Sequence, residues 1–128
     1  MVVGVGVDLV SIKRIERAYR RRPQRFCRRV FSTMELSLLL PRRPLFPAMT
    51  ARFAAKEAVL KALGCGLGPA SWREVEIIAL QGKQPRVQLT GEAGQLAGEK
   101  GITAIALSMT HEPPFAGAVA VAYSKAPV

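Results

Sequence analysis

The chain opens with an alternating pattern that predicts a strand over residues 2–9. Three valines recur there at every second position, which is the period of a β-strand rather than of a helix. The positions between them are Gly4, Gly6 and Asp8. Because glycine has no side chain, this second face of the strand leaves room for close approach of another segment.

Apolar residues at helical spacing follow the strand. Ile12, Ile15 and Tyr19 lie three and four positions apart, which predicts an amphipathic helix. Pro23 is expected to interrupt it, and residues 25–40 are expected to form a second, shorter helical region.

The strongest helix signal runs from Thr50 to Leu63, where Ala, Leu, Lys and Glu dominate. Thr50 is the expected N-cap and Gly64 the expected C-terminal stop. The proline-rich residues 41–47 before this helix are expected to form a loop.

The second half of the chain predicts two strand pairs with a short helix between them, capped by Thr90. The four expected strands cover residues 75–80, 86–89, 103–111 and 116–123. The order β-α-α-α-β-β-α-β-β indicates an α+β fold, with a sheet of about five strands packed with three to four helices. We expect one small domain over residues 1–128.

The composition favours a compact globular protein over a membrane or secreted one. Hydrophobic residues make up 49% of the 128 residues, which suits a compact core. No apolar run is long enough to cross a membrane, and the first residues lack the basic region of a signal peptide. Cys27 and Cys65 have no metal-binding spacing. These features predict a cytoplasmic protein in a reducing compartment, with no segment that spans a membrane.

Positive charge is concentrated near the N-terminus. Nine of the 19 Lys and Arg residues lie between Lys13 and Arg29, where the only acid is Glu16. Such a local field indicates an anionic partner, whether nucleic acid, a membrane surface or an acidic protein. The chain shows no RNA-binding motif and no interleaved aromatic platform for bases, which argues against nucleic acid.

The helix from Thr50 onward carries a chemically ambiguous set of charges. Glu57 and Lys61 are four residues apart, and by spacing alone they predict an ordinary surface ion pair on an exposed helix. Arg52 and Lys56 add two more cations, and three cations around one carboxylate suit a site for phosphate and a divalent metal. The glycines at positions 64, 66 and 68 would let backbone approach such a ligand closely.

Three other residues could have either a structural or a functional role. Asp8 could cap the following helix or bind Mg²⁺, which prefers one or two carboxylates together with substrate phosphates. Glu35 stands three residues after Ser32, the spacing of a capping box. His111 is the only histidine and lies at a strand end, on the face opposite Thr110.

Several motifs together resemble the holo-(acyl-carrier-protein) synthase family, the small bacterial phosphopantetheinyl transferases. They are "GVGVDLVSIKRIE" at 4–16, "FSTME" at 31–35, "RFAAKEAVLKALGCGLG" at 52–68, "WREVEI" at 72–77, "GKQPRVQLTG" at 82–91, "SMTHE" at 108–112 and the terminal "AVAVAY". They appear in order and at suitable spacing over almost the whole chain. The block from 52 to 68 is the most specific.

The resemblance implies the 4′-phosphopantetheinyl transferase fold and a defined reaction. Members transfer the 4′-phosphopantetheine group of coenzyme A to a serine of apo-acyl carrier protein, as part of fatty acid biosynthesis. The products are holo-acyl carrier protein and adenosine 3′,5′-bisphosphate, and the reaction requires Mg²⁺. Coenzyme A is therefore the expected co-substrate and Mg²⁺ the expected cofactor.

The resemblance also implies roles for individual residues. Asp8 and Glu57 match the metal ligands, and Lys61 matches the lysine that contacts the coenzyme A phosphate, so these three form the expected catalytic set. The other positions expected at the coenzyme A site are Arg52, Gly64, Pro85, Thr110 and His111.

The family is typically a homotrimer with sites between neighbouring subunits, and its basic first helix docks the acidic carrier protein. We therefore expect Arg14, Arg17, Arg21 and Arg25 to bind that partner, and we expect neither nucleic acid nor a membrane as a partner. The competing hypothesis is a basic RNA-binding module without catalytic activity, which would not need Asp8, Glu57 or Lys61.

Overall fold

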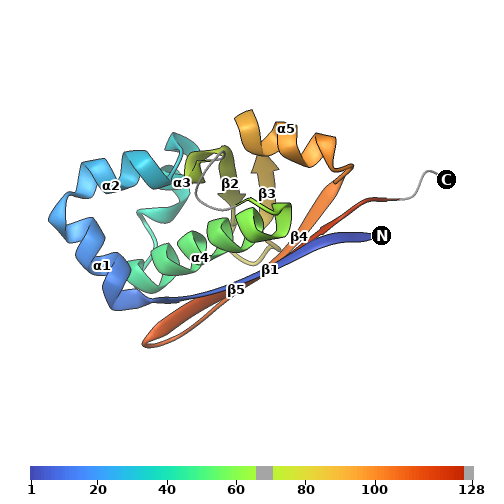
Figure 1. The fold of residues 1–128 in the computed structure, drawn as a ribbon. Coiled ribbons are helices and arrows are strands. Elements are labelled where there is room, and N and C mark those ends of the chain that lie inside the picture. Colours follow the sequence, from blue (N-terminus) through green and yellow to red (C-terminus); the bar gives the residue numbers. More distant parts are fainter. Residues whose placement is uncertain (66–70, 126–128) are drawn as a thin grey trace.

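The computed structural model describes residues 1–65 and 71–125 (Figure 1). The strands are β1 (Val2–Ser11), β2 (Val75–Ile78), β3 (Arg86–Leu89), β4 (Ala104–Glu112) and β5 (Phe115–Tyr123). The α-helices are α1 (Ile12–Arg21), α2 (Pro23–Val30), α3 (Thr33–Leu39), α4 (Leu45–Leu63) and α5 (Gly91–Glu99), and a 3₁₀ turn, η1, covers Trp72–Glu74. None of the described helices is long and apolar enough to span a bilayer.

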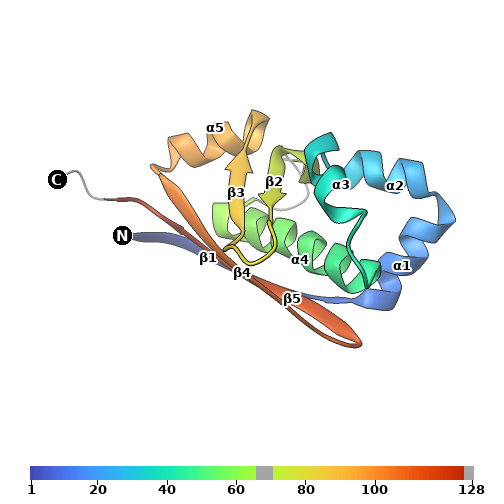
Figure 2. The same ribbon diagram turned by 180° about the vertical axis from the view of Figure 1, so that it is seen from behind.

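The expected α+β class is confirmed, but the strands divide between two sheets. One sheet has the order β1-β5-β4 with all neighbours antiparallel, and β2 pairs with β3 in a separate two-stranded sheet. The long helix α4 lies over the three-stranded sheet, with α1 and α2 at one end of the molecule and α5 at the other (Figures 1 and 2).

The helical region predicted over residues 25–40 is two helices, α2 and α3, so the described segments hold five α-helices. The break falls at Ser32, whose hydroxyl accepts a hydrogen bond from the N–H of Glu35 while the Glu35 carboxylate accepts one from the N–H of Ser32. The predicted capping box is therefore confirmed, and it starts a new helix because it satisfies two backbone donors that a helix start leaves unpaired.

Helix α4 begins at Leu45, so the predicted loop over residues 41–47 is confirmed only for residues 41–44, and the predicted N-cap at Thr50 is wrong. Pro47 is accommodated because the first helical turn has no use for its missing N–H. Thr50 is instead completely buried, and its hydroxyl has no hydrogen-bond partner among the described residues. At the other end Gly64 adopts the left-handed conformation of a helix stop, as predicted.

Helix α4 is buried on nearly all sides, which corrects the expectation from local spacing of an exposed helix. Its small residues, among them Ala54, Ala55 and Ala58, are completely buried, and so are Ala120 and Ala122 of β5. Small side chains on both elements allow the helix and the sheet to pack at short range.

The glycines of β1 lie against the backbone of α4. A methyl group added at Gly4 would overlap the carbonyl oxygen of Ala62, and one added at Gly6 would overlap that of Ala58. The close approach predicted for this face of the strand is therefore confirmed. The valine face of β1 points outward, and Val5 and Val7 are 59% and 60% exposed.

Replacing Gly6 by alanine is expected to lower the free energy of unfolding by about 1–3 kcal/mol, because neither backbone can move aside without disturbing the core. Urea unfolding measures the change. The matched control is Gly98→Ala in α5, where an added methyl group meets no atom within 4 Å and should gain up to about 1 kcal/mol of helix propensity. Equal stability of the Gly6→Ala variant and the unaltered chain would contradict the close contact.

Candidate active site

Asp8, Glu57 and Lys61 converge where β1 meets α4. Lys61 Nζ lies 3.1 Å from Asp8 Oδ1 and donates to the carbonyl oxygen of Val7 at 2.9 Å. Burial raises the pKa of Glu57, and the nearby charge of Asp8 raises this pKa further. The structure thus brings together the three residues predicted to be catalytic, although Asp8 lies about fifty positions before Glu57 and Lys61 in sequence.

The contacts remove two of the alternative interpretations. Among the described residues the ion pair of Lys61 is with Asp8, not with Glu57, so the predicted surface pair along the helix is wrong. Asp8 is not a helix cap either, because β1 continues past it to Ser11. Ser11 caps α1, with its hydroxyl accepting from the N–H of Arg14 at 3.3 Å.

The donor set at this site suits magnesium bound together with phosphate. Asp8 and Glu57 supply two carboxylates, and no group of three or more His, Cys, Asp or Glu converges within residues 1–65 and 71–125. Mg²⁺ typically takes one or two protein carboxylates and completes its shell with water and substrate phosphates. The residues present therefore fit a metal that is shared with a phosphate ligand.

A cleft of about 260 Å³ lies on another side of α4, bordered by the β2–β3 hairpin and β4. It collects four of the predicted coenzyme A residues: Arg52, Pro85, Thr110 and His111. Thr110 and His111 both border it although they alternate along β4, because β4 is an edge strand and the cleft follows that edge.

Two cations of this cleft were not predicted from the sequence. Arg42 lies in the proline-rich stretch and Lys83 in the β2–β3 turn, and neither position has a local pattern that marks it as functional. Arg52 is only 5% exposed and donates to the carbonyl oxygen of Ala48 at 3.0 Å. Burial lowers the pKa of Arg52, and the charge of Arg42 lowers it further, so an anionic ligand here would relieve repulsion between cations.

The predicted site residues therefore form two groups on different flanks of α4. Glu57 follows Arg52 by five positions, which turns its side chain about 140° around the helix axis. Lys61 and Gly64 belong to the Glu57 end of the helix and do not border the cleft. Gly66 and Gly68 lie outside the described residues.

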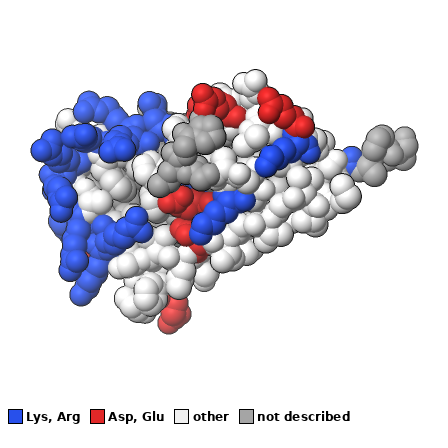
Figure 3. All heavy atoms as spheres, viewed as in Figure 1, with Lys and Arg blue, Asp and Glu red and all other residues white. Residues whose placement is uncertain are grey.

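A groove of about 500 Å³ runs between the basic helices α1 and α2 and the side of α4. Its floor is apolar and its rim is formed by five arginines. The lining residues include Arg14, Arg21, Arg22, Arg25 and Arg29 together with Ile15, Phe26, Val30, Phe53 and Trp72. The basic side chains dominate this end of the molecule (Figure 3).

Three of the four arginines predicted to bind a partner line this groove, and Arg17 does not. Arg22, between α1 and α2, and Arg29 of α2 were not predicted, because helical spacing along α1 cannot show which later residues face it. The described rim is therefore cationic, as predicted, but its arginines come from the region of two helices, α1 and α2.

The groove adjoins the acidic pair through Trp72. The indole ring packs against Phe53 with ring centroids 5.4 Å apart. Its N–H and the charge of Arg14 both act to lower the pKa of Glu57, against the larger effect of burial. The indole N–H is buried and has no hydrogen-bond partner in good geometry among the described residues. It therefore influences the pKa of Glu57 without forming a regular hydrogen bond to it. A molecule in the groove would therefore lie next to Glu57.

Comparison with known proteins agrees with this geometry. The sequence model of the 4′-phosphopantetheinyl transferase superfamily, ACPS, matches residues 4–115. The chain belongs to this superfamily. The chain is 46% identical to the holo-[acyl-carrier-protein] synthase of Moorella thermoacetica over 119 residues, which cover 93% of this chain and 92% of that protein.

Solved structures show the same fold. The holo-[acyl-carrier-protein] synthase of Neisseria meningitidis superposes with a TM-score of 0.87 at 33% identity, covering 97% of this chain and all of that one. The Helicobacter pylori enzyme, solved in complex with coenzyme A, gives 0.81 at 30% identity over 93% of this chain and 99% of that one. The predicted family and the enzyme class, a phosphopantetheinyl transferase, are confirmed.

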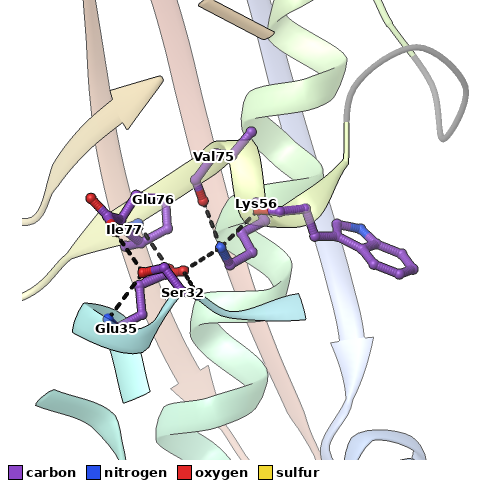
Figure 4. Close-up of polar contacts among 7 residues, drawn as sticks. Ser32, Glu35, Lys56, Val75, Glu76 and Ile77 are labelled. Carbon is purple, nitrogen blue, oxygen red and sulfur yellow. Dashed lines mark hydrogen bonds and ion pairs between the residues drawn. The ribbon is translucent and has the colours of Figure 1, made fainter. Parts of the chain in front are cut away.

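In this member of the superfamily one predicted site cation is instead part of the core. Lys56 is completely buried, and its Nζ donates to Glu35 Oε1 at 2.7 Å and to the carbonyl oxygens of Trp72 and Val75 at 2.9 and 2.6 Å (Figure 4). All three of its N–H donors are used, so Lys56 is not one of three cations around Glu57 and the sequence hypothesis on this point is wrong.

Glu35 completes this buried network from α3. Its Oε2 accepts from the N–H of Ile77 at 2.9 Å, and Ser32 donates to Glu76 at 2.6 Å. Burial lowers the pKa of Lys56 while the charge of Glu35 raises it. The pair joins α3, α4, η1 and β2, and removal of one partner of such a pair typically costs about 3–5 kcal/mol.

Proposed function

We propose that this chain transfers the 4′-phosphopantetheine group of coenzyme A to a serine of an apo-acyl carrier protein. The observation that carries the proposal is the convergence of Asp8, Glu57 and Lys61 next to an arginine-rimmed groove. The names of its relatives and the coenzyme A bound in the Helicobacter pylori structure support the same assignment. Holo-acyl carrier protein and adenosine 3′,5′-bisphosphate would be the products, and the proposed pathway is fatty acid biosynthesis.

Asp8 and Glu57 would hold Mg²⁺, which when bound would neutralise charge on the coenzyme A diphosphate. Lys61 is suited to act beside them, because 54% of its side chain is exposed although Nζ lies on Asp8 Oδ1. Its ammonium can therefore reach a phosphate oxygen without leaving the carboxylate. The buried Arg52 and the adjacent His111 would hold the rest of coenzyme A in their cleft.

In the proposed reaction the serine Oγ of the carrier protein attacks the phosphorus that bears pantetheine. The bond from that phosphorus to the bridging oxygen of the bisphosphate breaks, the bridging oxygen keeps the electron pair, and the serine proton is released. Negative charge grows on the leaving group, so positioned cations supply most of the catalysis. Lys61 has the position and charge for this role.

The groove suits an acidic, amphipathic segment of the carrier protein. Its apolar floor offers Phe26, Phe53 and Trp72 to a hydrophobic face, and the arginine rim offers planar guanidinium groups to carboxylates. Because Trp72 and Arg14 of the groove also act on the pKa of Glu57, a carrier bound there would bring its serine toward the proposed metal ligands.

We also propose a homotrimer with sites between subunits. The outer face of the sheet is apolar and exposed, with Val5, Val7 and Leu9 exposed by 59%, 60% and 68%. Large exposed apolar faces are typical of subunit contacts. A neighbour could also unite the cleft at Arg52 with the acidic pair, which one chain keeps apart. Sedimentation equilibrium should give a mass of three chains, and a single-chain mass at assay concentration would contradict the proposal.

Intact-mass spectrometry tests the activity directly. After incubation with coenzyme A, Mg²⁺ and an apo-acyl carrier protein, the carrier should gain the mass of the phosphopantetheine group. Glu57→Gln should reduce the rate by at least about 100-fold, with unchanged urea unfolding. The control Glu16→Gln removes a partly exposed carboxylate that pairs with Arg20 on α1, and it should leave the rate unchanged. No mass gain with several carriers, together with tight salt-sensitive RNA binding, would favour the RNA-binding alternative.

Charge reversal tests the docking surface. Arg21→Glu on the groove rim should raise KM for the carrier by about 10-fold with little change in kcat, and the difference should shrink as salt screens the charges. Arg17→Glu reverses the same charge on α1 away from the groove lining, so its effect on KM should be smaller. Equal effects of the two substitutions would show that net charge, rather than the groove, attracts the carrier.

A further inference from the structure

The C-terminal end of α4 receives a lysine from a distant part of the chain. Lys100 follows α5, and its Nζ donates to the carbonyl oxygen of Leu63 at 2.6 Å. Gly64 has a φ of 80°, and a methyl group added there would overlap Lys100 Nζ. Gly64 therefore serves two purposes: it adopts the left-handed conformation that stops the helix, and it leaves space for the ammonium group.

This lysine lies where the backbone is most negative. Helix α4 is 19 residues long. The N–H of Gly64 donates to the carbonyl oxygen of Lys61, and the N–H of Cys65 donates to that of Leu60. The carbonyl of Leu63 is bonded to Lys100 instead. The C-terminus of a helix behaves as about half a negative charge, so an anion at this end would normally be repelled.

The proposed function places an anion at this end. Coenzyme A is expected to contact Lys61, in the last turn of α4, and Gly64, the C-cap of this helix. Lys61 alone offsets only part of the repulsion between the helix end and this anion, because its Nζ is already bonded to Asp8 and to the carbonyl of Val7. A second cation fixed on the last carbonyl groups would cancel the repulsion.

We propose that Lys100 is a positioning residue for coenzyme A, whose ammonium group on the Leu63 carbonyl makes the end of α4 able to accept the diphosphate. The inference rests on the proposed function, because it takes the ligand from there. Lys100 acts through the helix end, so its effect is electrostatic and depends on its charge rather than only on its hydrogen bond.

Binding of coenzyme A to Lys100→Gln, measured by titration calorimetry, tests this role. Glutamine keeps a neutral donor for the Leu63 carbonyl but removes the charge. The dissociation constant should rise about 5-fold at low salt, and the difference should narrow as salt is added. Lys100→Arg should restore binding, because it restores the cation.

The matched control is Lys125→Gln, which removes the same charge from an exposed lysine after β5, where only the backbone N–H bonds to Thr103. It should bind coenzyme A as the unaltered chain does. Urea unfolding of each variant separates loss of binding from loss of fold. If Lys100→Gln did not fold, Lys100→Met would take its place, because methionine also removes the charge and keeps an unbranched side chain.

The outcomes separate the two proposals. Equal affinity of the unaltered chain and Lys100→Gln, or equal loss in Lys125→Gln, would overturn the role of Lys100 and leave the transferase assignment intact. If the unaltered chain itself neither bound coenzyme A nor modified a carrier, the proposed function would fail, and the role of Lys100 would fail with it.

Discussion

The contact between the glycines of β1 and the backbone of α4 is the constraint on which the rest of the structure depends. Gly4 and Gly6 leave no side chain between strand and helix, so Asp8 lies within the electrostatic reach of Glu57 and within bonding distance of Lys61. A larger residue at either glycine would increase the spacing and separate the two carboxylates. The site therefore depends on the lack of side chains at these two glycines as much as on its charged residues.

Helix α4 organises two different chemical environments because it is buried on nearly all sides. One flank carries Glu57 and Lys61 and adjoins the arginine-rimmed groove, and another carries Arg52 toward the cationic cleft. Between them, Lys56 points into the core and bonds to η1, β2 and α3 (Figure 4). The buried network thus ties one wall of the groove and the β2–β3 hairpin of the cleft to the same helix.

Local sequence patterns located every strand and the cap at Ser32, because period and hydrogen-bonding chemistry are properties of neighbouring residues. They were wrong about the start of α4, where Pro47 looked like a loop residue but falls in the first turn. They were also wrong about Lys56, which has the same spacing to Arg52 as Lys61 has to Glu57 but faces the core. Helical spacing shows which residues share a face, but not what that face meets.

The sequence alone determined the strands, the basic first helices, the family and the candidate residues Asp8, Glu57 and Lys61, because motifs and periodicity are local. Only the tertiary structure decided that Lys61 pairs with Asp8, that the Arg52 cleft is separate from the acidic pair, and that Lys100 caps α4. Each of these depends on contacts between segments that are distant in the chain. Such contacts arise from packing, and they cannot be predicted from the spacing of residues along one helix.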